Sequence, residues 1–113
     1  MGYDIGTAFG KIAAAASRIG RPIARNLLYL YFVLKESEMT SQQKMWIYAA
    51  IAYVLVPNDF LPVRIFRLVG ITDDAVAVMY VVSKVRKHIT PAIIQKVEMI
   101  LDQWYGYEIG FVE

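Results

Sequence analysis

The order of apolar and polar residues along this chain predicts helix almost throughout. Five helices are expected, from Ile5 to Arg18, from Pro22 to Ser37, from Thr40 to the residue before Pro57, from Thr72 to His88, and from Pro91 to the residue before Gly106. The first break falls where Gly20 is suited to end one helix and Pro22 to occupy the first turn of the next. We therefore predict an all-α fold, a small bundle of four to five helices.

Residues that commonly begin or end helices support these boundaries. Thr40 and Gln43 form the pattern of a capping box, in which each side chain bonds the backbone N–H of the other residue. At the last helix, Thr90 is a good N-cap, Pro91 suits the first helical position, and Gly106 is a good C-terminal cap.

The segment Leu27–Leu34 is apolar on every face, which argues for burial on more than one side. Hydrophobic residues make up 58% of the chain, above the usual share of about 45–50% for soluble domains. An ordinary monomer would leave much of this apolar surface exposed. We therefore expect a membrane or a partner subunit to cover these faces.

The apolar runs in the third and fourth helices are short. The run from Met45 to Val56 holds twelve residues, about 18 Å of helix against a hydrocarbon core of about 30 Å. The run from Ala75 to Val82 is shorter still. We expect a core hairpin, or a pair of helices that dips into one leaflet, and neither helix is expected to cross the bilayer.

Positive charge is concentrated near the amino terminus, whereas the carboxyl-terminal region is acidic. Residues 1–24 predict a basic amphipathic arm, and the cations assigned to a membrane or partner surface are Lys11, Arg18, Arg21 and Arg25. Such an arm suits an anionic membrane, where each cation near the lipid contributes about 1 kcal/mol. A solvated helix face is the alternative interpretation. The sequence lacks a dense Lys/Arg cluster and a recognisable binding module, so no nucleic-acid partner is expected.

Length and composition set further limits. A chain of 113 residues fits a single helical domain over residues 1–113, with a short tail at residues 107–113. The absence of cysteine excludes disulfides and thiolate metal sites and permits a reducing cytoplasm. We expect a protein associated with the cytoplasmic side of a membrane, with a soluble cytoplasmic oligomer as the alternative.

A hinge rich in proline and aspartate separates the two central helices. Its residues are, in order along the chain, Tyr53, Pro57, Asp59, Pro62, Gly70, Asp73 and Asp74. In the YkvA-like domain family, a helix ending in Tyr-x-x-x-Pro-x-Asp is followed by a proline and then by Gly-x-x-Asp-Asp at the start of the next helix. Residues 25–106 of this chain resemble that family. The resemblance implies a small helical, often membrane-associated protein and assigns neither a reaction nor a ligand.

The hinge departs from the family pattern in one stretch. Family members often carry Ile-Pro-Asp and a further proline before the glycine, whereas here Val63 follows Pro62 and the second proline is missing. Arg64 and Arg67 occupy this stretch instead. If the missing acid belongs to a shared site, that site is weakened here or its charge balance is reversed.

The acids of the hinge have a structural and a functional interpretation. With Thr72 as N-cap, Asp73 and Asp74 fall in the first helical turn, where the free amides and the helix dipole stabilise carboxylates by about 0.3–1 kcal/mol each. Asp59 is similarly suited to cap a turn or to pair with an arginine. The alternative is a Mg²⁺ or Ca²⁺ site or a proton-handling pair centred on Asp59 and Asp73, with Asp74 as a further candidate ligand. No other cofactor is expected.

Other routes to catalysis find little support. His88 lies near a helix end, where histidine is typically a solvated or capping residue, and no serine stands in a nucleophile motif. The larger aromatic residues are more typical of a core or an interfacial belt than of a ligand cage; they include Trp46, Tyr48, Tyr53, Tyr80 and Trp104. We therefore expect a non-enzymatic module that associates with a membrane or with itself and has no identifiable small-molecule substrate. A metal- or proton-dependent activity centred on Asp59 and Asp73 is the alternative.

Overall fold

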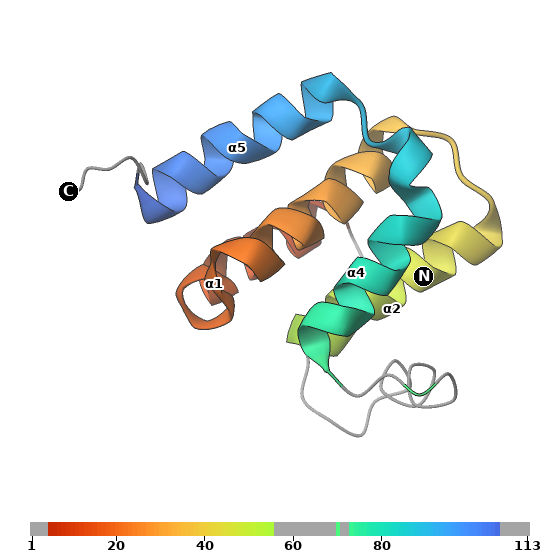
Figure 1. Ribbon diagram of the computed structural model, residues 1–113, viewed down its shortest axis with the longest axis horizontal. Helices are drawn as coiled ribbons and strands as arrows, with labels where there is room; N and C mark the ends of the chain where they lie inside the picture. Colours follow the sequence, from red (N-terminus) through yellow and green to blue (C-terminus); the bar gives the residue numbers. More distant parts are fainter. Residues whose placement is uncertain (1–4, 56–69, 71–72, 107–113) are drawn as a thin grey trace.

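The described helices follow one another in the order that the sequence predicts. The computed structural model describes residues 5–55, 70 and 73–106. Within these ranges it contains no strand, and the elements are α1 (Ile5–Glu36), α2 (Ser41–Leu55), α4 (Asp74–Val85), the short 3₁₀-helix η1 (Arg86–His88) and α5 (Pro91–Tyr105). The predicted all-α fold, a small helical bundle, is confirmed (Figure 1).

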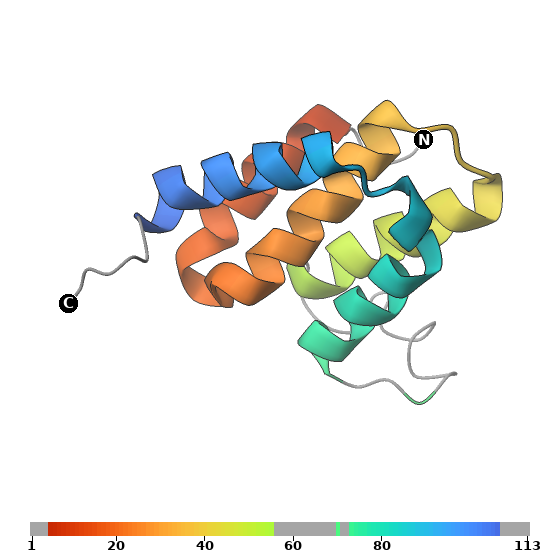
Figure 2. The same cartoon turned by 45° about the horizontal axis from the view of Figure 1, so that its top comes forward.

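Helix α1 is folded back on itself at Gly20. This residue has φ 84° and ψ 162°, a backbone conformation outside the helical region that is essentially restricted to glycine. The two halves of α1 therefore run alongside each other in opposite directions (Figure 2), and Phe9 meets Tyr31 with ring centroids 5.3 Å apart. The predicted break at Gly20 and Pro22 is confirmed, and it produces a helical hairpin.

The second half of α1 is the central element of the fold. It lies between α5 on one side and the pair formed by α2 and α4 on the other (Figure 2). All three helices contribute residues to one continuous core. Leu27, Leu28, Leu30 and Val33 are fully buried. The expectation that lipid or a second subunit covers the segment Leu27–Leu34 is therefore wrong. The chain covers these faces itself, because the first half of α1 folds back and three further helices surround the second half.

Helices α2 and α4 form an antiparallel pair against one side of α1. The buried stripe of α2 includes Ile47, Ile51 and Val54, and it packs against α4, whose buried residues include Val78 and Val81. Among the described residues, no helix combines the length and the hydropathy needed to cross a bilayer.

The predicted helix ends are largely confirmed. The Thr40 N–H donates to Gln43 Oε1 at 3.0 Å, and the Gln43 N–H donates to Thr40 Oγ1 at 3.1 Å, which completes the capping box. Thr90 caps α5 by accepting from the Ile93 N–H, and Gly106 follows its last turn with φ 78°. The fourth helix ends earlier than predicted, since it gives way to η1 after Val85.

Candidate functional site

The hinge motif lies mostly outside the described residues. Pro57, Asp59 and Pro62 fall there, as do Arg64 and Arg67, so the proposed role of Asp59 and the detail of the hinge stay predictions. Of the remaining motif residues, Tyr53 packs half-buried against the core near the end of α2. Gly70 has φ 82°, which favours glycine.

Asp73 is the N-cap of α4. Its backbone is extended, with φ −112° and ψ 132°, and its Oδ1 accepts a hydrogen bond of 3.1 Å from the Val76 N–H. The prediction of Thr72 as N-cap is therefore wrong by one residue, because aspartate caps a helix at least as well as threonine. Asp74 becomes the first helical residue. The structural interpretation of Asp73 as a helix-initiating acid is confirmed.

Replacing Asp73 tests how much this cap contributes. Asp73→Asn should lower the free energy of unfolding by at most about 1 kcal/mol, because the amide oxygen can still accept from the Val76 N–H. Asp73→Ala should cost about 0.5–2 kcal/mol, because that N–H loses its partner. Chemical denaturation of the two variants measures the difference. Loss of a bound divalent ion from a folded Asp73→Asn variant would contradict a purely structural role.

A metal site is not assembled within the described part of the chain. Among those residues, no three carboxylate or imidazole side chains gather closely enough to hold an ion. Asp59 lies outside them, and the side chain of Asp74 is likewise not described. The metal- or proton-dependent alternative therefore stays a prediction.

The four cations of the basic arm divide into two pairs. Lys11 and Arg18 are exposed on the first half of α1, where they line a shallow hollow of about 280 Å³ together with Ala14, Ala15 and Leu55. Among the side chains that the structure describes, neither Lys11 nor Arg18 has a carboxylate partner. This pair is available to an anion.

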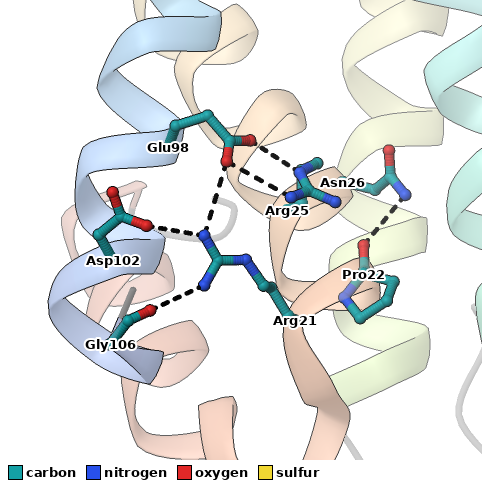
Figure 3. A network of polar contacts seen from close by, with 7 residues as sticks. All are labelled: Arg21, Pro22, Arg25, Asn26, Glu98, Asp102 and Gly106. Carbon is teal, nitrogen blue, oxygen red and sulfur yellow. Dashed lines mark hydrogen bonds and ion pairs between the residues drawn. The ribbon is translucent and has the colours of Figure 1, made fainter. Parts of the chain in front are cut away.

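Arg21 and Arg25 instead join α1 to α5 (Figure 3). Arg21 donates to Asp102 Oδ1 at 2.8 Å and to the Gly106 carbonyl at 3.2 Å, and Arg25 Nε donates to Glu98 Oε2 at 2.8 Å. We call these contacts the α1–α5 ion-pair network. Only 12% of the Arg21 side chain is exposed, so its pair is less screened by water than an ordinary surface pair, which contributes about 0–1 kcal/mol.

Sequence reasoning missed the acidic half of this network. The two arginines stand four residues apart on α1, and Glu98 and Asp102 stand four residues apart on α5. Residues with this spacing share one helix face. The matching spacing and the opposite charge of the two chain ends could therefore have indicated that these faces pair. The pairing was not predicted because the two helices are far apart in the sequence.

Tyr29 on α1 and Tyr105 at the end of α5 have raised pKa values. Burial raises the pKa of Tyr29, the nearby Glu98 carboxylate raises it further, and Arg25 partly offsets both effects. Burial also raises the pKa of Tyr105, which Arg21 lowers in part. The Tyr105 hydroxyl donates to the Ala16 carbonyl at 2.5 Å and so ties the end of α5 to the first half of α1. Both tyrosines therefore act as neutral structural groups at physiological pH.

A second hollow lies at the other end of α2. It has a volume of about 260 Å³ and is lined by Gln42, Gln43, Trp46, Lys84 and Val85. The Trp46 and Tyr80 rings meet edge to face, with centroids 5.6 Å apart and an interplanar angle of 70°. We call this feature the Trp46 hollow.

The other aromatic residues lie in or beside the core. Three of them are half-buried against the core: Tyr53, Tyr80 and Trp104. The ring centroids of Trp104 and Phe9 are 5.8 Å apart. His88 belongs to η1 and, with Lys87 and Glu38, borders an open hollow. His88 is half-buried there, and its expected role as a solvated or capping residue stays a prediction.

One comparison with known proteins gives a match. Residues 43–83 match the model of a family described as "Protein of unknown function (DUF1232)". The matched segment runs from the first turn of α2 through the hinge to the last turns of α4. No curated protein and no solved structure was found to match the chain. The YkvA-like domains are this same family, so the resemblance seen in the sequence is confirmed over residues 43–83. Its wider extent, residues 25–106, stays a prediction.

Proposed function

We propose that this chain, whose residues 43–83 are a YkvA-like domain of the DUF1232 family, is a non-enzymatic module that attaches to the surface of an anionic membrane. The family has no known function and therefore assigns no chemistry. The observation that carries the proposal is the pair Lys11 and Arg18, exposed on one helix without a carboxylate partner among the described side chains.

The positions of these two cations suit a lipid surface. They stand seven residues apart, which is about two helical turns, so both lie on one face of the first half of α1. Ala14 is exposed between them, and its small side chain lets a flat surface approach the helix. Leu55 adds an apolar wall to the same hollow. A phosphate at the lipid surface would contact the cations, with an apolar group of the lipid against Leu55.

The neighbouring acids do not cancel this charge. Glu98 and Asp102 are occupied by Arg25 and Arg21 in the α1–α5 ion-pair network. The first half of α1 therefore presents net positive charge to its surroundings. Since anionic lipids are concentrated in the cytoplasmic leaflet, we place the protein on the cytoplasmic side of a membrane.

Self-association is the second candidate, because some apolar side chains remain exposed. Val76 and Met79 lie on one face of α4 and are 51% and 59% exposed. Ile94 and Met99 are exposed on α5. These residues would form the contact in a soluble cytoplasmic oligomer. Each group is small, so we favour lipid attachment through the cations.

Vesicle binding tests the proposal. The wild-type chain should cosediment with vesicles rich in anionic phospholipid, and binding should weaken as the salt concentration rises. The double variant Lys11→Gln with Arg18→Gln should bind about 30-fold more weakly, since two cations contribute about 1 kcal/mol each. The matched control is Lys44→Gln with Arg86→Gln, which removes the same charge from exposed positions on α2 and at the start of η1.

Three outcomes would count against this function. Equal losses in the two double variants would show that the total charge decides binding and that the face of α1 does not. Equal binding to neutral vesicles would remove the electrostatic basis of the proposal. A chain that stays monomeric at high concentration and does not bind anionic vesicles would contradict both attachment to lipid and self-association.

A further inference from the structure

We infer that the Trp46 hollow is a binding site for a small organic carboxylate with an apolar body. The hollow lies where the beginning of α2 meets the end of α4. It is nine residues along α2 from Leu55, roughly 14 Å, and is thus separate from the cationic hollow of Lys11 and Arg18. The inference does not depend on membrane attachment.

The apolar wall of the hollow is preformed, so a ligand need not order it. Trp46 is half-buried and held edge to face by Tyr80, a geometry that aromatic rings favour. Val85 lies beside it and is buried against the core. An apolar or aromatic ligand body would therefore meet a surface whose side chains are already ordered, which reduces the entropy lost on binding.

Lys84 supplies the charge. Its Nζ lies 4.9 Å from the centroid of the Tyr80 ring and 5.8 Å from that of Trp46, so two aromatic faces hold the ammonium beside the hollow. No carboxylate among the described side chains pairs with it. An anionic ligand would therefore displace no carboxylate of the described side chains. One ammonium balances one negative charge, which favours a monocarboxylate over a phosphate dianion.

The polar groups of the hollow favour a ligand that accepts hydrogen bonds. Lys84 has three N–H donors and no acceptor. The Gln43 side-chain oxygen already accepts from the Thr40 N–H in the capping box, which leaves the NH₂ donors of Gln43 for a ligand. Gln42 adds a second, exposed amide. A carboxylate, which only accepts hydrogen bonds, matches this set.

The volume limits the size of the ligand. About 260 Å³ falls just below the range of about 300–1,000 Å³ that is usual for small-molecule sites. A single ring that carries one carboxylate fits this space, whereas a nucleotide does not. Benzoate is therefore a suitable probe, with benzamide as its neutral analogue and benzylammonium as its cationic one.

Titration of the ¹⁵N-labelled full chain, followed by NMR, tests the site. The chain has two tryptophans, so Trp104 serves as an internal control. Benzoate should shift the indole N–H signal of Trp46 in a saturable way and leave that of Trp104 unchanged. Benzoate should bind about tenfold more tightly than benzamide, since a hydrogen bond to a charged group is about twice as strong as a neutral one. Benzylammonium should not bind.

Variants at position 84 separate charge from packing. Lys84→Gln should reduce benzoate binding to the level of benzamide, and Lys84→Arg should retain most of it because the cation remains. Lys44→Gln, an exposed cation on the same helix as Trp46, should leave binding unchanged. The amide spectrum of each variant reports whether the fold is intact.

Several results would overturn the assignment. Equal affinity for benzoate and benzamide, or benzoate affinity unchanged in a folded Lys84→Gln variant, would remove Lys84 from the site. Equal shifts of both indole signals, or no shift with any probe, would show that no such site exists. Tighter binding of phenyl phosphate than of benzoate would contradict the carboxylate assignment.

Discussion

Leu30→Ala is expected to lower the free energy of unfolding by about 2–5 kcal/mol without changing the oligomeric state of the folded protein. Leu30 is fully buried in the second half of α1, where the other helices of the same chain surround it. Truncation removes apolar contacts and leaves a cavity that the neighbouring helices fill only in part. A domain of this size is stabilised by only about 5–15 kcal/mol, so the loss is large. Urea denaturation followed by circular dichroism measures it.

The matched control is Met45→Ala on α2. Met45 is 44% exposed, and substitutions at such positions usually change stability by less than about 0.5 kcal/mol. Sedimentation of both variants reports their oligomeric state. If Leu30→Ala dissociates an oligomer while its unfolding free energy stays unchanged, the contacts of Leu30 are intermolecular, and the packing described above is wrong.

The ends of the helices could be predicted because their signals are local. Thr40 and Gln43 stand three residues apart, and their reciprocal bonds need no other part of the chain. Thr90 and Gly106 act on adjacent backbone groups in the same way. The wrong assignment of Thr72 as the N-cap of α4 also rests on a local signal. Adjacent threonine and aspartate are both good caps, and the sequence alone does not decide between them.

The cover of the central helix could not be predicted, because it depends on contacts between distant residues. The segment Leu27–Leu34 indicates burial on several sides and carries no information about what buries it. The hairpin at Gly20 brings the first half of α1 onto the second, so that Ala8 and Ile12 join the same core. The helix break thus supplies part of the cover that the composition assigned to lipid or to a second subunit, and α2, α4 and α5 supply the rest.

The basic arm shows the same limit at the candidate site. Its four cations carry the same charge and were therefore assigned one role, yet the structure places them in two environments. Lys11 and Arg18 line a hollow, whereas Arg21 and Arg25 pair with acids of α5. The difference arises from α5, whose acids lie more than seventy residues further along the chain. Periodicity within one helix identifies a polar face, whereas the partner of that face depends on the tertiary fold.

Gly20→Ala is expected to destabilise the protein by about 1–3 kcal/mol, because φ 84° with ψ 162° is a conformation essentially restricted to glycine. The added methyl group would meet no close neighbour, since the nearest atom is Pro22 Cδ at 4.0 Å. The cost is therefore backbone strain and not a clash. It acts at the point where the two halves of α1 separate, so the strain opposes the hairpin itself. Thermal unfolding should show a lower midpoint, by roughly 4 °C for each kcal/mol.

Gly10→Ala provides a control of opposite sign on the same helix. Gly10 is exposed within the first half of α1, and a methyl group there would meet nothing within 4 Å. Alanine in a helix interior is favoured over glycine by roughly 0.5–1 kcal/mol, so this variant should be more stable than the wild type. Opposite changes at two glycines would identify the backbone conformation at position 20 as the cause. Should both variants gain stability, α1 would be a continuous helix through Gly20, and the hairpin that covers Leu27–Leu34 would not form.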